Sequence, residues 1–235
     1  KNQQLKKALL TSVDFLNAGD YDSIRTMIDN ALKAGQDKNM GHEYNKDVES
    51  RYREDHRITV ATPWEQFNEL LGGGLGGGDF GLIFGNPGGG KSWMMVAIAG
   101  HAVKMGFNVV YYTLELGEVY VGKRFDAYFA NESVNQIHLH RKKIENEINR
   151  LEGKLVVKEF SMGKATVQTL ESHIQKLKDI DISPDLVIID YIDLLRSPKR
   201  SFDRKDEIDD VYVATKGLAR DLVFKILKGM RLKRC

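Results

Sequence analysis

Apolar and polar residues alternate along most of the chain in segments of two kinds. Short apolar runs flanked by polar residues or glycine predict buried β-strands, and they lie at 80–84, 108–114, 155–160 and 186–189. Between them, apolar residues recur every three or four positions, which predicts helices at 93–105, 119–130, 134–151 and 167–177. Strands that alternate with helices predict an α/β fold, with a mostly parallel sheet flanked by helices on both faces.

The first 57 residues depart from this pattern. Apolar residues at helical spacing predict short helices up to about residue 34, and the stretch 36–57 is polar and highly charged. We therefore predict two parts. A small helical N-terminal segment with a linker occupies 1–57, and the α/β core occupies 58–235.

Composition narrows the class of protein. Of the 235 residues, 42% are hydrophobic and 29% are charged, which excludes a disordered or collagen-like chain. No apolar stretch approaches the ~20 residues that span a bilayer, so we predict no membrane segment. The one cysteine, Cys235, cannot form an intrachain disulfide, and a reducing cytoplasm fits this usage best.

Charge is distributed unevenly although the net charge is only +2. The net charges are 0 for 1–57, −4 for 58–195 and +6 for 196–235. A basic end is typical of a protein that binds a polyanion, and it is equally typical of a solvated basic surface.

Glycine is concentrated in one window, since eleven of the 22 glycines lie between Gly72 and Gly90. We interpret the stretch 72–78 as a tight turn before the first core strand. The stretch 85–92 fits G-x-x-x-x-G-K-[ST] between a strand and a helix, the pattern of a phosphate-binding P-loop. We assign nucleotide binding to Gly85, Asn86, Pro87, Gly88, Gly89, Gly90, Lys91, Ser92 and Trp93.

The P-loop needs further groups for chemistry. Lys91 is expected to reach the β- and γ-phosphates and Ser92 to ligate Mg²⁺, so ATP and Mg²⁺ are the predicted cofactors. Asp190 follows a buried strand at the same sheet edge, and we predict that it completes the metal site; Asp193 is the less favoured alternative. Glu115 follows the strand 108–114 and is the candidate for orienting the attacking water, with Glu118 as its competitor.

These motifs together carry a family resemblance. The runs ELLGGGLGGGDFGLIFGNPGGGKS, NVVYYTLELGE and LVIIDYIDLL resemble the RecA-fold ATPase domain of DnaB-type hexameric replicative helicases, especially those of bacteriophages. The resemblance covers about 58–222 and implies that Lys91 and Ser92 form the Walker A pair, Glu115 is the catalytic glutamate and Asp190 is the Walker B aspartate. RecA, RadA and KaiC-like ATPases share much of this layout.

The resemblance also implies partners. DnaB-type helicases place DNA-contacting loops after the Walker B strand, which here implies single-stranded DNA binding at Arg196, Lys199, Arg200, Arg204 and Lys205. It further implies a hexameric ring, a primase or helicase loader as partner, and a bacterial or phage-infected cytoplasm. By resemblance the N-terminal segment is a linker or collar remnant that packs on the neighbouring subunit; a helical cap on its own core is the alternative.

The C-terminal end departs from the family. There, a strand inserts between the P-loop and Walker B strands, followed by further strands, a second DNA loop and an arginine finger. Here only VFKILKGMRLKRC follows Leu222, and residues 223–227 fit either that strand or a continued helix. We expect the core to be truncated at this end. Because an arginine finger contributes ~10³ to 10⁵ in rate, we expect nucleotide binding to exceed turnover.

The leading hypothesis is an ATP-hydrolysing replicative DNA helicase motor subunit that moves on single-stranded DNA as a ring. One alternative is a RecA or KaiC-like ATPase of recombination or regulation. Another is a nucleotide-binding assembly module with little turnover.

Overall fold

The structure, a computed structural model, describes residues 58–197 and 203–221, and the backbone of 225–231. The chain divides into two compact units, Lys1–Asp55 and His56–Cys235. In the first unit only five residues are described, and three of them, Phe15, Tyr21 and Ile24, are helical. The predicted N-terminal helices and linker otherwise lie outside the described residues.

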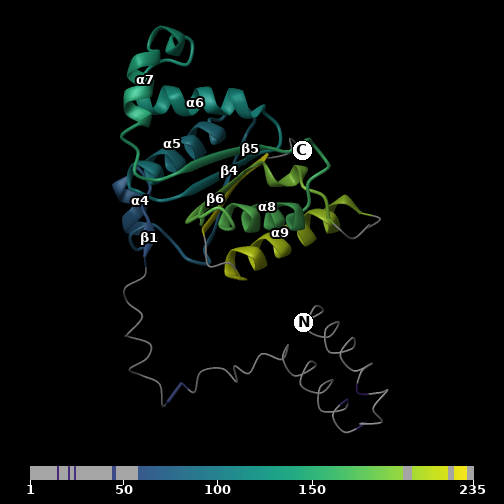
Figure 1. Cartoon of the computed structure of the whole chain (residues 1–235). Coiled ribbons are helices and arrows are strands. Elements are labelled where there is room, and N and C mark those ends of the chain that lie inside the picture. Colours follow the sequence, from purple (N-terminus) through teal and green to yellow (C-terminus); the bar gives the residue numbers. More distant parts are fainter. Residues whose placement is uncertain are drawn as a thin grey trace. The chain divides into compact units, whose positions relative to one another are not determined.

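The second unit is built on a parallel sheet. Its strands have the order β3-β7-β6-β4-β5, and every neighbouring pair is parallel. They are β3 (Phe80–Gly85), β4 (Val109–Thr113), β5 (Leu155–Glu159), β6 (Leu186–Asp190) and β7 (Lys225–Arg231). Helices α5 and α6 cover one face, and α8 and α9 cover the other (Figure 1). The predicted α/β architecture is therefore confirmed.

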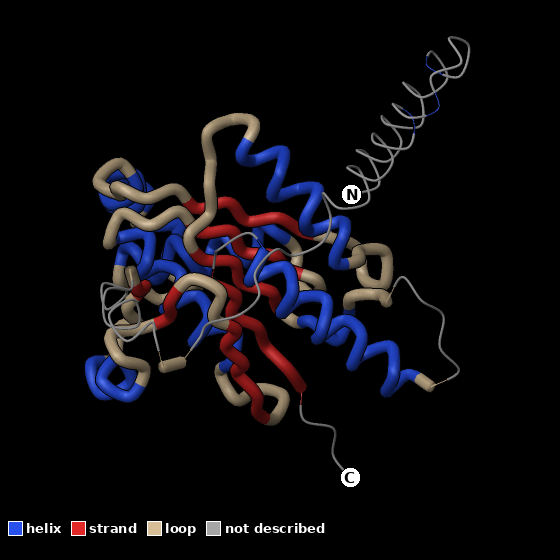
Figure 2. Tube along the Cα trace, turned by 90° about the horizontal axis from the view of Figure 1, so that it is seen from below, coloured by secondary structure: helices blue, strands red, loops and turns tan. Residues whose placement is uncertain are grey.

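The helices agree with the apolar spacing in most places. They are α5 (Lys91–Lys104), α6 (Glu118–Ala130), α8 (Val167–Lys178) and α9 (Arg204–Asp221). Thr166 caps α8, because its side chain accepts a hydrogen bond from the Thr169 N–H. Shorter elements complete the unit: β1 (Thr59–Val60), α4 (Glu65–Leu70), β2 (Leu75–Gly76), η1 (Ile137–Leu139), α7 (Arg141–Ile148) and η2 (Ile192–Leu194). Figure 2 shows the strands from below, with helices on either side.

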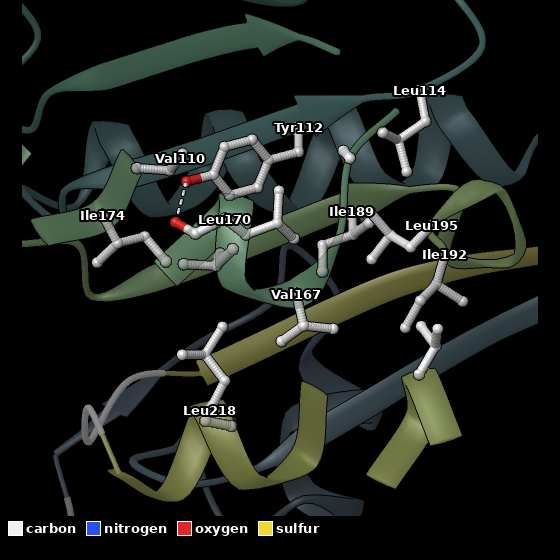
Figure 3. Close-up of a cluster of buried hydrophobic side chains, with 14 of the residues drawn as sticks. Val110, Tyr112, Leu114, Val167, Leu170, Ile174, Ile189, Ile192, Leu195 and Leu218 are labelled. Atoms are coloured by element: carbon white, nitrogen blue, oxygen red, sulfur yellow. Dashed lines mark hydrogen bonds between the residues drawn. The ribbon is translucent and has the colours of Figure 1, made fainter. Parts of the chain in front are cut away.

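Side chains of the central strands alternate between two cores. On β4, Tyr111 faces a cluster with α5 and α6 that includes Met95 and Phe125. Its neighbour Tyr112 faces the opposite cluster, with Leu170 and other residues of α8 (Figure 3). This period of two buries both faces of β4, which explains why the sequence reads as a continuous apolar run.

The helix predicted over 134–151 is wrong as a single element. The structure has a 3-10 turn, η1, followed by the separate helix α7. His140 lies between them with φ −114° and ψ 25°, outside helical geometry. Ile137 and Ile144 still share one small cluster, so the apolar spacing identified a common buried face but not the break within it.

Near the C-terminal end, the sequence fitted either a strand or a continued helix, and the structure has a strand. Residues 225–231 form β7, which pairs with β3 on one side and β6 on the other. The continued helix is therefore wrong for these residues, although α9 does run to Asp221. The strand inserts between the P-loop strand and the strand that ends at Asp190; residues 222–224 lie outside the described residues.

The stretch 72–78, predicted as one tight turn, is interrupted by the strand β2, and Gly72, Gly73 and Gly74 connect α4 to β2. β1 and β2 are antiparallel, with Val60 opposite Leu75. Gly72, Gly73 and Gly74 all have positive φ, and a Cβ at Gly74 would overlap the Val60 carbonyl oxygen. Only glycine fits this position, because the backbone conformation and the space both exclude a side chain.

None of the helices in the described ranges is both long and apolar enough to cross a membrane.

We predict that Gly74→Ala lowers the free energy of unfolding by about 2 kcal/mol, because the new methyl group meets the Val60 carbonyl in a left-handed backbone. Urea unfolding of the full chain measures this loss. Gly122→Ala is the control, since its Cβ would meet nothing within 4 Å and alanine favours a helix by about 0.5–1 kcal/mol. Equal stability of the Gly74 variant and the wild type would contradict the assignment.

Candidate active site

The loop between β3 and α5 has the geometry of a phosphate cradle. Gly88 and Gly90 have φ of 78° and 81°, and Gly90 is the N-cap of α5. The Lys91 ammonium donates hydrogen bonds to the carbonyl oxygens of Gly85, at 2.9 Å, and Asn86, at 2.8 Å. An ammonium has three N–H donors, so Lys91 is held over the loop with a donor left for a ligand.

Asp190 reaches the same region from β6. The strand register places Thr113 opposite Asp190, and the Leu114 N–H donates to the Asp190 carbonyl oxygen at 2.8 Å. The ends of β4 and β6 are thereby fixed to each other. Because all these strands are parallel, their carboxyl ends lie at the edge of the sheet where α5 begins.

The Asp190 carboxylate is held by a buried tyrosine. Asp190 is 5% exposed, and the Tyr111 hydroxyl donates to its Oδ2 at 2.9 Å. Burial, followed by the nearby Asp190 charge, raises the pKa of Tyr111 well above its usual value. The hydroxyl therefore keeps its proton at physiological pH and remains a donor to the carboxylate.

Glu115 lies just beyond β4, in a turn closed by Thr113. The Thr113 hydroxyl donates to the Leu116 carbonyl oxygen at 2.7 Å, and the Leu116 N–H donates back to the hydroxyl at 3.2 Å. Thr113 is fully buried, so this turn is anchored in the core. Glu115 itself is exposed, which leaves its carboxylate accessible to a ligand or to water.

One cleft of about 290 Å³ collects most of the predicted residues. They are Pro87, Gly88, Gly89, Gly90, Lys91, Ser92, Trp93, Glu115 and Asp190. Gly85 and Asn86 do not line it and instead supply the carbonyls that hold Lys91. Ser92 and Asp190 are thus brought to one cavity, as a shared metal ion requires.

The two competing acids lie elsewhere. The Glu118 carboxylate accepts a hydrogen bond from the Glu159 N–H, and Glu159 accepts one from the Glu118 N–H, so this pair ties α6 to β5. Asp193 accepts a hydrogen bond from the Tyr212 hydroxyl at 3.3 Å. Neither acid lines the cleft, which favours Glu115 and Asp190 over them.

Sequence reasoning missed Arg124, a cleft residue from the middle of α6. Its guanidinium lies 5.2 Å from the ring centroid of Trp93 and 5.0 Å from that of Tyr120. Its Nε is buried and has no hydrogen-bond partner among the described residues. Such a group is costly unless something pairs with it, so the cleft contains a cation suited to an anionic ligand. No local motif marks it in the sequence.

The basic segment after β6 borders a second cavity, of about 420 Å³. Arg196 and Arg204 line it together with the acids Asp193 and Glu207. The Arg196 N–H donates to the Ala165 carbonyl at 2.9 Å, while neither arginine forms an ion pair with a described residue. Lys205 is exposed in the first turn of α9. Lys199 and Arg200 lie outside the described residues.

A family model agrees with this geometry. The model of the DnaB-like helicase C terminal domain matches residues 59–235. The chain belongs to this family. The resemblance drawn from the motifs is therefore confirmed. RadA, a DNA repair protein, also matches, but over a smaller part of this chain than the phage helicase does.

Individual relatives give the extent of the similarity. The DnaB-like replicative helicase of Enterobacteria phage T4 is 25% identical over 189 residues, which is 76% of this chain and 40% of that protein. The DNA repair protein RadA of Chlamydia trachomatis serovar D is 28% identical over 144 residues, 61% of this chain and 25% of RadA. The chain thus spans less than half the length of the curated relatives it matches.

Solved structures share the fold. A DnaB-like replicative helicase, studied with its interactions with primase, superposes with a TM-score of 0.69 at 19% identity, over 99% of this chain and 58% of that one. A second solved structure, described as an ATPase domain, superposes with a TM-score of 0.66 at 20% identity, over 83% of this chain and 72% of that one.

The residues at the cleft fit a magnesium ion. The described residues contain no group of three or more histidine, cysteine, aspartate or glutamate side chains arranged for a metal. Mg²⁺ does not need one, because it prefers oxygen ligands and is commonly held by one or two protein groups together with phosphates and water. The Ser92 hydroxyl and the Asp190 carboxylate are such ligands.

We predict that Tyr111→Phe raises the Mg²⁺ concentration needed for half-maximal ATP binding by about tenfold, because the carboxylate of Asp190 loses the donor that orients it. Titrating Mg²⁺ against a fluorescent ATP analogue measures this. Tyr112→Phe is the matched control, since Tyr112 is equally buried but faces the opposite core. If both variants respond alike, the hydrogen bond has only a general structural role.

Proposed function

We propose that this chain is the motor of an ATP-dependent replicative DNA helicase, which hydrolyses ATP in the cleft described above. The observation that carries the proposal is that Lys91, Glu115 and Asp190 come from three separate segments and line one cavity. Membership of a helicase domain family supports coupling ATP hydrolysis in this cleft to movement on DNA.

The P-loop is proposed to bind the triphosphate. Residues 88–92 line the cleft at the N-terminus of α5, where backbone N–H groups and the helix dipole favour negative charge. Lys91 directs its remaining N–H donor to the β- and γ-phosphates, which bind along the same loop. Trp93 is 44% exposed at the cleft wall and contributes an apolar surface beside the phosphates.

Ser92 and Asp190 are proposed to hold Mg²⁺, which when bound neutralises charge that develops on the phosphate oxygens. Asp190 is suited to this because Tyr111 and the Leu114 N–H fix its side chain and backbone. Ser92 is suited because it sits in the first turn of α5, directly after Lys91.

Glu115 is proposed to orient the water that attacks the γ-phosphate. Its carboxylate is accessible, borders the cleft and follows a turn anchored by the buried Thr113. A carboxylate in this position accepts a hydrogen bond from the water. It thereby orients the water so that a lone pair of the water oxygen points at the γ-phosphorus.

Arg124 of α6 is proposed to contact the phosphates. Cation–π contacts with Trp93 and Tyr120 hold the guanidinium. A phosphate oxygen can accept a hydrogen bond from its buried Nε–H, which has no partner among the described residues. The site thus has a cation of its own subunit in addition to Lys91.

The segment after β6 is proposed to contact single-stranded DNA. Arg196 and Arg204 border one cavity, and Lys205 is exposed at the start of α9; Lys199 and Arg200 fall between them in sequence. Basic groups of this kind neutralise backbone phosphates without reading sequence. The acids Asp193 and Glu207 in the same cavity limit how much net positive charge it offers.

We also propose that the chain assembles into a ring and that a primase or helicase loader binds it. Its proposed location is a bacterial or phage-infected cytoplasm. The DnaB-like helicase of phage T4 and the DnaB-like structure studied with primase support these proposals. The similarity to RadA favours one alternative, an ATPase of DNA repair. Unwinding of a forked duplex, compared with pairing of homologous strands, distinguishes the two.

We predict that Glu115→Gln abolishes ATP turnover, by at least about a hundredfold, while ATP binding is preserved, because the amide keeps the shape of the side chain but cannot accept the proton of water. Single-turnover hydrolysis and equilibrium binding of ATP measure the two effects. Lys91→Ala is the contrasting variant and should lose binding as well. Loss of binding in both variants would assign Glu115 a structural role.

We predict that Arg196→Ala with Arg204→Ala lowers the slope of log affinity against log salt by about 1.4, since each contact to a single strand contributes about 0.7. Fluorescence anisotropy with oligo(dT) measures the slope. Arg141→Ala is the control, an exposed arginine at the start of α7. An unchanged slope in the double variant would remove these two arginines from the DNA surface.

A further inference from the structure

A third cavity lies at the edge of the sheet, away from the nucleotide cleft. It has a volume of about 520 Å³ and is formed by the end of β5 and one face of α8, from Gln168 to Lys176. Lys158, His173 and Lys176 line it, with the hydroxyl of Ser172 and the ring of Phe160. No described lining residue carries a carboxylate, so the two lysines give the cavity a net positive charge.

The two lysines are not neutralised within the domain. Neither forms an ion pair with a described residue, and Lys158 instead lies 5.9 Å from the ring centroid of Phe160. Burial, then Lys158 and Lys176, lowers the pKa of His173. Both ammonium groups are therefore close to the same imidazole ring, and the positive charge of the pair is concentrated at one place.

Tyr112 holds the ring of His173 in the wall of the cavity. The Tyr112 hydroxyl lies 3.0 Å from His173 Nδ1, and it donates to the Leu170 carbonyl oxygen at 3.5 Å. A neutral imidazole carries one N–H whichever nitrogen holds the proton. The cavity therefore presents two ammonium groups, an imidazole ring and the Ser172 hydroxyl.

Donors without carboxylates recognise an oxyanion. The arrangement is continuous with the Arg196 cavity, because Thr166, which lines the edge cavity, forms a bridge to Arg196. Met162 and Gly163 of the same segment line the Arg196 cavity. The exposed Lys164 belongs to the same segment. The segment 161–166 therefore connects the two cavities and carries one lysine.

We propose that the edge cavity binds a backbone phosphate of a single-stranded nucleic acid, as a second contact point beyond Arg196 and Arg204. The proposal rests on the single-strand binding proposed above and extends it to a longer footprint. A strand that occupies both cavities follows the segment 161–166 that connects them. A strand too short to reach the edge cavity gains nothing from Lys158 and Lys176.

The test compares the full chain with Lys158→Ala plus Lys176→Ala, using fluorescent oligo(dT) of about 6 and about 30 nucleotides. At about 0.1 M salt, affinity for the long strand should fall roughly 25-fold, as the loss of two phosphate contacts requires. Affinity for the short strand should be unchanged. The arginine pair Lys158→Arg with Lys176→Arg should restore long-strand binding. Lys142→Ala with Lys154→Ala, two exposed lysines elsewhere, should have no effect.

Two results would overturn the proposal: an unchanged long-strand affinity, or an equal loss for both lengths. A different result would contradict the DNA contact proposed for Arg196 and Arg204. If Arg196→Ala with Arg204→Ala leaves short-strand binding unchanged while the lysine pair still reduces long-strand binding, the edge cavity binds the strand and the Arg196 cavity does not.

Discussion

The register between β4 and β6 is the constraint on which the site depends. It pairs Thr113 with Asp190, and the next N–H along, that of Leu114, bonds to the Asp190 carbonyl. A shift by one residue would turn every side chain of β4 to the other face. Tyr111 would then leave Asp190, and the turn that carries Glu115 would lose its buried anchor. The chemistry at the sheet edge is thus held by backbone pairing inside the core.

Two adjacent tyrosines show how one strand serves both faces. The Tyr111 hydroxyl reaches the carboxylate at the nucleotide cleft, while the Tyr112 hydroxyl reaches His173 on the opposite face. Both side chains are fully buried, and each satisfies its polar atom at the far end of an apolar ring. The same strand therefore supports the nucleotide site and the edge cavity without sharing any side chain between them.

Much of the site could be predicted because its signals are local. The P-loop is one contiguous motif, and Asp190 and Glu115 each directly follow an apolar run. Arg124 could not be predicted, because it enters the cleft from mid-helix and its position depends on how α6 packs on α5. The break at His140 was hidden for a similar reason, since Ile137 and Ile144 keep helical spacing across it. The choice between strand and helix for 225–231 was settled by pairing partners distant in sequence.

The position of β7 has a consequence for how the protein folds. β3 and β6 carry the two halves of the nucleotide site, yet they are not neighbours, and the strand between them comes from the far end of the described chain. During synthesis the P-loop emerges well before the strand that joins it to Asp190. Pairing across such sequence distance is slow because the loop entropy must be overcome first. ATP binding would therefore report the pairing of β7 with β3 and β6, and a nascent chain would acquire it only after β7 has been synthesised.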